Sequence, residues 1–133
     1  MTREDLKGIY YANKEIERLK RRVEELETAV MNMTAKNDGM PKSNSNKNYL
    51  IEDLIDTKEL LRLKIQSLMI NKDMAERYIA SIPDPLVRLV LAHRYIDNLS
   101  WYQVACRIGG DNTEESVRQI ASRFFRKEKD RTI

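Results

Sequence analysis

Apolar residues near the start of the chain recur every seven positions, in two interleaved rows. One row holds Ile9, Ile16, Val23 and Val30, and the other holds Ala12, Leu19, Leu26 and Met33. This a/d heptad runs for four repeats without a proline, and it predicts one helix over residues 2–33. β-branched residues fill the first row, which in a parallel pair of helices favours two strands.

The heptad pattern resumes over residues 49–82, after a polar segment at residues 34–48 that predicts a loop. Additional apolar residues widen the stripe of this second helix, as is typical of a helix with more than one packing partner. They are Leu50, Ile55, Leu60, Leu63, Met69, Met74 and Tyr78. The two helices could form an antiparallel hairpin or extend to pair with a second chain. A core this thin predicts a homodimer through the heptad helices.

Prolines and polar residues divide the remainder of the chain into three shorter helices. Asp84 followed by Pro85 is the pattern of a helix start. We expect the apolar face of this helix to be Leu86, Leu89, Val90, Ala92, His93 and Ile96. A short helix over residues 99–108 begins with a capping box between Ser100 and Gln103.

The last helix follows a turn at residues 109–112, and we expect Asn112 or Thr113 to cap it, with Asn112 and Glu115 forming a second capping box. A small residue, Ala105, suits a steep crossing of two helices, and Val117 with Ile120 would hold the last helix in place. These features predict an all-α fold. It would consist of a long coiled-coil helical hairpin over residues 1–82, followed by a three-helix helix-turn-helix domain over residues 83–133.

The outer face of the last helix has residue types that read DNA. Arginine and glutamine bind guanine and adenine edges through two hydrogen bonds, and the basic residues that follow suit phosphates. The candidate DNA-contacting residues are Thr113, Glu115, Ser116, Arg118, Gln119, Ser122, Arg123, Arg126 and Lys127.

Composition excludes several other classes of function. The net charge is only +3, so bulk charge does not argue for nucleic acid. One cysteine (Cys106) and one histidine (His93) exclude a cysteine cage or a multi-histidine zinc site, and we expect Cys106 to be a small buried filler. With no catalytic constellation, leader or long apolar run, we expect a cytoplasmic non-enzyme without cofactor or metal, away from membranes.

Two stretches, Leu99–Ala105 and Val117–Arg123, resemble the promoter-reading C-terminal domain of bacterial sigma factors. The layout of the whole chain, with Met40-Pro41 in the polar loop and the pattern Arg-Tyr-Ile-Asp-x-Leu-Ser-Trp at Arg94–Trp101, is similar to the phage late-transcription regulators related to ArpU. The resemblance implies a DNA-binding regulator of phage or prophage genes in a bacterial host. Its partners would be double-stranded DNA and, through the coiled coil, a second copy or host RNA polymerase.

A second interpretation assigns the chain to another class of protein. The two glutamates Glu114 and Glu115 at the start of the last helix, together with the modest net charge, favour a protein–protein adaptor or a phage DNA-packaging scaffold. In that case the C-terminal helices would dock onto another protein rather than onto DNA.

Overall fold

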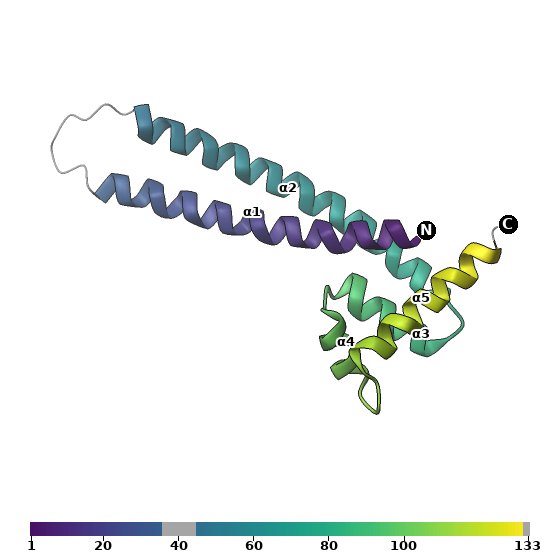
Figure 1. Ribbon diagram of the computed structural model, residues 1–133. Coiled ribbons are helices and arrows are strands. Elements are labelled where there is room, and N and C mark those ends of the chain that lie inside the picture. The colour runs from purple at the N-terminus through teal and green to yellow at the C-terminus, as the bar shows by residue number, and fades with distance from the viewer. Residues whose placement is uncertain (36–44, 132–133) are drawn as a thin grey trace. The chain divides into compact units, whose positions relative to one another are not determined.

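The computed structural model describes residues 1–35 and 45–131 of the chain. Every regular element in these ranges is helical, which confirms the all-α prediction (Figure 1). The elements are α1 (Arg3–Ala35), α2 (Ser45–Ala80), α3 (Pro85–Leu91), the π-helical turn η1 (Ala92–Ile96), α4 (Trp101–Ile108) and α5 (Glu114–Arg131). Residues 36–44 of the predicted loop lie outside the described residues.

The bounds of α2 differ from the predicted range 49–82 at both ends. The helix already includes Ser45, and it ends at Ala80, where the backbone tightens: the Ile82 N–H donates to the Ile79 carbonyl at 3.0 Å. The residue before a proline is disfavoured in helical conformation, and Ile82 precedes Pro83. The helix therefore stops before the proline rather than at it.

The chain forms two compact units that differ from the predicted division at residue 83. The middle unit comprises Lys14–Ser67, and the terminal unit comprises Met1–Asn13 together with Leu68–Ile133. The terminal unit gains the start of α1 because Leu6 and Ile9 are buried there, and it gains the end of α2 through the buried Ala75 and Ile79. Non-local burial, which a local pattern does not reveal, causes this difference.

In the middle unit, three ion pairs join α1 to α2. They are Glu15 with Lys64 at 2.7 Å, Glu27 with Lys58 at 3.0 Å, and Arg22 with Asp53 at 3.3 Å. Glu15, the earliest of the three partners in α1, pairs with Lys64, the latest in α2, so the two segments run antiparallel. Exposed ion pairs contribute little stability, so the buried Ile16 and Leu26 of the predicted heptad rows supply most of the attraction.

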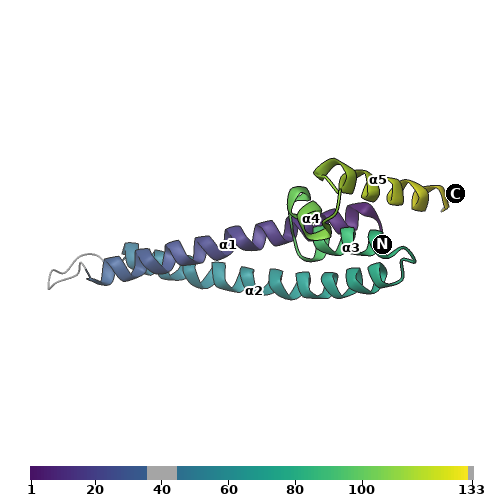
Figure 2. The same ribbon diagram turned by 90° about the horizontal axis from the view of Figure 1, so that it is seen from below.

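The core of the terminal unit lies among α3, η1, α4 and α5, which contact one another (Figures 1 and 2). Its buried residues from these elements are Val87, Val90, Leu91, Tyr95, Val104, Ala105, Val117, Ala121 and Phe125. The predicted apolar face of α3 was wrong in part, because Leu86 and Leu89 are 37% and 50% exposed. Val87 and Leu91 are buried instead. The buried face of α3 is therefore shifted by one residue from the face that we expected.

A π-helical turn follows α3, and the sequence pattern did not reveal it. The Asp97 N–H donates to the Ala92 carbonyl at 2.9 Å, five residues back, and Asn98 then takes a positive φ of 59°. The turn places the Arg94 guanidinium 4.0 Å from the centre of the Tyr10 ring and 4.6 Å from that of Trp101. Such cation–π contacts connect α1, η1 and α4.

Three further ring contacts connect these elements to one another and to α5. The Arg3 guanidinium lies 5.5 Å from the centre of the Phe125 ring of α5, and the Tyr95 ring meets Trp101 and Phe125 edge to face. Burial raises the pKa of Tyr95, because the loss of water outweighs the opposing effect of the charges on Arg3 and Arg94. The first turns of α1 are therefore part of the core that holds α5.

The role of α1 in this core predicts the effect of Leu6→Ala. Removing a fully buried leucine side chain should lower the free energy of unfolding of the terminal unit by about 2–5 kcal/mol. Fluorescence of Trp101, the only tryptophan, reports this unit during urea unfolding. The matched control Leu89→Ala removes a half-exposed leucine in the same unit and should cost about 0.5 kcal/mol. Equal losses in the two variants would contradict the placement of Leu6.

Candidate nucleic-acid interface

The capping box predicted at the start of α4 is confirmed. The Ser100 hydroxyl accepts from the Gln103 N–H at 3.2 Å, and the Gln103 side-chain oxygen accepts from the Ser100 N–H at 2.9 Å. Two otherwise unsatisfied donors of the helix start are thereby bonded. The direction in which α4 leaves the preceding segment is thus fixed by local hydrogen bonds.

A glycine pair makes the turn from α4 to α5. The Gly109 N–H donates to the Ala105 carbonyl at 3.0 Å, and Gly109 has φ 75° and ψ −161°. This backbone region is open almost only to glycine. Gly110 also has a positive φ, of 63°. The turn predicted at residues 109–112 is confirmed, and the two glycines give it its backbone conformation.

The second predicted capping box, between Asn112 and Glu115, was wrong. The Thr113 hydroxyl instead accepts from the Ser116 N–H at 3.1 Å, and the Ser116 hydroxyl accepts from the Thr113 N–H at 2.8 Å. The Asn112 amide donates back to the Gly109 carbonyl at 3.1 Å, within the turn. A serine at the third helical position can return the bond as glutamate would. Two predicted DNA-contacting hydroxyls, those of Thr113 and Ser116, therefore cap α5.

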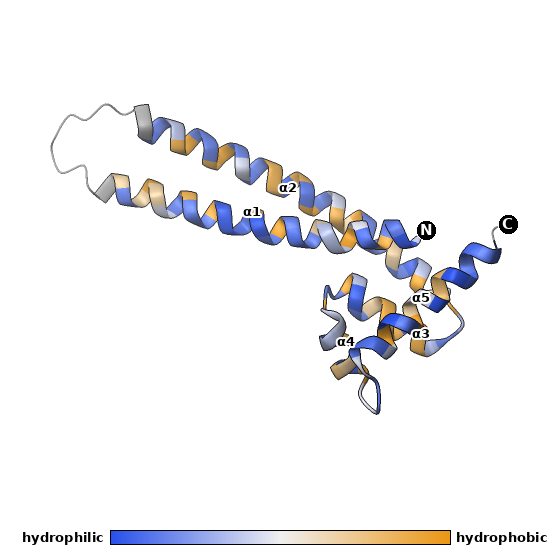
Figure 3. Cartoon of the chain, in the orientation of Figure 1, coloured by the Kyte–Doolittle hydropathy of each residue, from blue (hydrophilic) through white to orange (hydrophobic). Residues whose placement is uncertain are grey.

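The inner face of α5 packs into the core of the terminal unit. Val117, Ala121 and Phe125 are buried, whereas Ile120, which we expected to hold the helix, is only half-buried. The exposed positions of the helix are polar, so its ribbon in Figure 3 carries both hydrophilic and hydrophobic colours. The helix is thus held by one side and presents the other to solvent.

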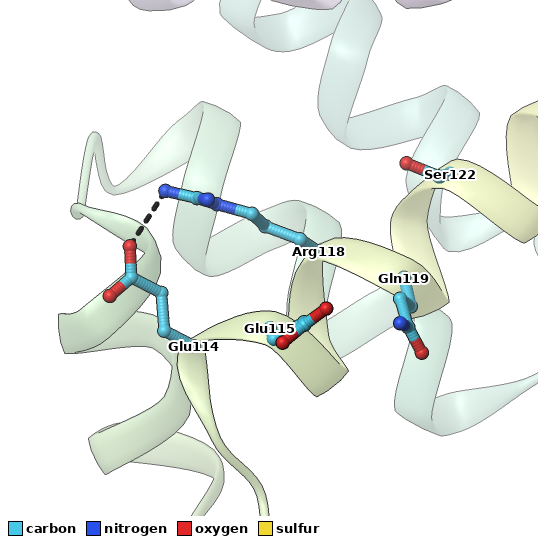
Figure 4. A pocket seen from close by; sticks show the side chains of 5 residues that line it. All are labelled: Glu114, Glu115, Arg118, Gln119 and Ser122. Atoms are coloured by element: carbon cyan, nitrogen blue, oxygen red, sulfur yellow. Dashed lines mark hydrogen bonds and ion pairs between the residues drawn. The ribbon is translucent and has the colours of Figure 1, made fainter.

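Five of the predicted DNA-contacting residues belong to this outer face. Four of them, Glu115, Arg118, Gln119 and Ser122, line a shallow hollow together with Glu114 (Figure 4). Arg126 follows Ser122 by one turn, is exposed, and makes no ion pair among the described residues. Arg118 extends back along the helix and bonds the Glu114 carboxylate at 2.6 Å.

The remaining two predicted residues, Arg123 and Lys127, lie on another flank of α5. Both line a groove formed with the start of α3, which also includes Leu86 and Phe124. The structure therefore separates the nine predicted residues into an outer face, a helix cap and a groove. Sequence spacing alone did not distinguish these places, because all nine fall on the part of the helix that is not core.

Charge is distributed unevenly along α5. From Arg118 to Lys127 the helix carries four basic residues and no acidic one. The acidic residues stand at its two ends, Glu114 and Glu115 at the start and Glu128 and Asp130 near the finish. The middle of α5 is therefore locally cationic although the whole chain is nearly neutral, and a phosphate backbone is attracted to such a stretch.

Cys106, predicted to be a buried filler, is exposed. The inward positions of α4 are taken by Val104 and Ala105, so the next residue faces outward. In the described part of the chain, no three His, Cys, Asp or Glu side chains lie together so that they could hold a metal ion. No helix in residues 1–35 or 45–131 has both the length and the apolar character needed to cross a membrane.

No protein-family model, curated protein or solved structure matches this chain. The assignment of a function therefore depends on the geometry of α4 and α5 and on the residues of the outer face.

Proposed function

We propose that the chain is a DNA-binding transcription regulator in which α4, the glycine turn and α5 act as a helix-turn-helix. The observation that carries the proposal is the outer face of α5, where Arg118, Gln119 and Arg126 stand on a helix whose opposite side is buried. A recognition helix needs this combination, because it must be rigidly held by one face while the other enters the major groove.

Different residues of the outer face would contact the base edges and the phosphates. Gln119 and Arg118 have the side chains that recognise adenine and guanine. Arg126, lying further along the same face, suits a phosphate. Arg123 and Lys127 lie toward α3, so the proposal depends on them less than the sequence suggested.

The ion pair between Arg118 and Glu114 affects how Arg118 would meet DNA. Both side chains are about half exposed, at 56% and 46%, so the pair contributes little to folding. It does hold the guanidinium at the start of the helix and offsets its charge. Arg118 must break its ion pair with Glu114 to bind a base. Glu114 thus lowers the affinity of the chain for DNA.

The long helices would bring two reading helices together or contact RNA polymerase. Several large apolar side chains of α2 are exposed to solvent, and such side chains support self-association. Among them are Ile55, Leu63 and Met74, each at least half exposed. The resemblance carried by Arg94–Trp101 further suggests control of phage or prophage genes in the cytoplasm of a bacterial host. The chain would act by binding and not as an enzyme.

A protein–protein adaptor or DNA-packaging scaffold is the second candidate. The acidic start of α5 and the exposed apolar residues of α2 favour it. The two candidates differ in their response to salt. DNA affinity falls steeply as salt rises because bound phosphates release counterions, whereas docking through apolar residues changes little.

DNA binding is tested by selecting bound sequences from random DNA and measuring fluorescence anisotropy over a range of salt. Gln119→Ala should cost about 1–3 kcal/mol on the selected site and relax specificity. Arg126→Ala should weaken all sequences about equally and reduce the salt slope by about 1. The matched control Arg21→Ala removes an exposed arginine of α1 and should change neither. Unchanged affinity in both α5 variants would refute the proposal.

The ion pair of α5 gives a second prediction. Glu114→Gln should raise DNA affinity more than Glu115→Gln does, because only the first substitution releases Arg118 as well as removing a negative charge. Anisotropy titrations of the two variants on the same DNA measure the difference. Equal gains would show that the charge alone matters, and that Arg118 does not reach DNA by leaving Glu114.

A further inference from the structure

A groove of about 340 Å³ lies between the start of α3 and the flank of α5, within the terminal unit. Its floor is apolar, and Leu86 remains 37% exposed there although it belongs to a helix with a buried face. Phe124 and Ile120, both half-buried, continue the apolar surface on α5. An apolar floor of this kind gains free energy when a partner covers it.

Two cations at the edge of this groove are uncommitted. Arg123 and Lys127 stand one helical turn apart, both are exposed, and neither makes an ion pair among the described residues. The other charges of the groove are engaged: Arg131 pairs with Glu128 at 3.5 Å, and the Asp84 carboxylate accepts from the Leu86 N–H at 2.9 Å. The groove therefore offers an apolar floor with two adjacent positive charges.

The exposed face of α2 in the middle unit has the opposite charges at the same spacing. Glu52 and Asp56 stand one helical turn apart, both are exposed, and neither has an ion-pair partner in the described residues. Ile55 lies beside them on the helix and is 60% exposed. Glu59, one turn further, is already bonded to Arg62 at 3.1 Å, and this bond lowers the pKa of Glu59.

We infer that the groove between α3 and α5 binds the α2 helix of a second copy of this chain, with Ile55 on the apolar floor and Glu52 and Asp56 against Arg123 and Lys127. DNA fits this groove less well, since phosphates would satisfy the two cations and leave Leu86 and Phe124 uncovered. The inference deepens the self-association in the proposed function but does not require that the chain bind DNA. Each copy carries one groove and one acidic face, so the contact joins two unlike surfaces of neighbouring copies.

Charge reversal on the full chain tests the pairing, with the mass in solution measured by sedimentation and light scattering in the absence of DNA. The wild-type chain should self-associate. Glu52→Lys with Asp56→Lys, and separately Arg123→Glu with Lys127→Glu, should each raise the dissociation constant about tenfold or more. Combining all four substitutions should restore association to within about threefold of the wild type, because the charges again match.

A control variant, Arg18→Glu with Arg21→Glu, reverses two exposed cations of α1 and should leave the mass unchanged. A wild-type chain that stays monomeric at every concentration overturns the inference, as does a combined variant that associates no better than the two separate ones. DNA titrations of the same variants are read separately. If the Arg123→Glu, Lys127→Glu variant loses DNA affinity but associates normally, the cations serve DNA and the groove assignment is wrong. A chain that associates as predicted but binds no DNA refutes the proposed function alone.

Discussion

The packing of the first turns of α1 into the terminal unit, where Leu6 and Ile9 are buried and Arg3 lies over the Phe125 ring, is the constraint on which the position of α5 depends. A domain made only of residues 83–133 would be close to the size at which a single apolar core gives little net stability. The first turns of α1 and the end of α2 add the missing apolar surface. The helix α5 is therefore held in a unit that includes residues from the start of α1 and the end of α2.

Two arginines connect the start of α1 to the shorter helices of the terminal unit. Arg94 of η1 lies between the rings of Tyr10 and Trp101, and Arg3 of α1 lies over Phe125. The contacts of Arg94 with Tyr10 and of Arg3 with Phe125 each join α1 to one of the shorter elements of the terminal unit.

Features set by neighbouring residues were predictable from the sequence. The Ser100 capping box, the Asp84-Pro85 helix start and the glycine turn all follow from interactions within a few residues. The π-turn, the exposure of Leu86 and the burial of Leu6 in another unit were not predictable, because they depend on which distant surface each helix meets. For the same reason the nine candidate DNA residues looked equivalent in sequence, yet only five share the outer face.

Separating residues 83–133 from the rest of the chain tests the central claim most directly. Urea unfolding followed by Trp101 fluorescence can be compared between this fragment and the full chain. If the start of α1 completes the core, the fragment alone should show no cooperative transition, while the full chain should unfold cooperatively. A fragment that unfolds cooperatively at the same urea concentration as the full chain would contradict the account.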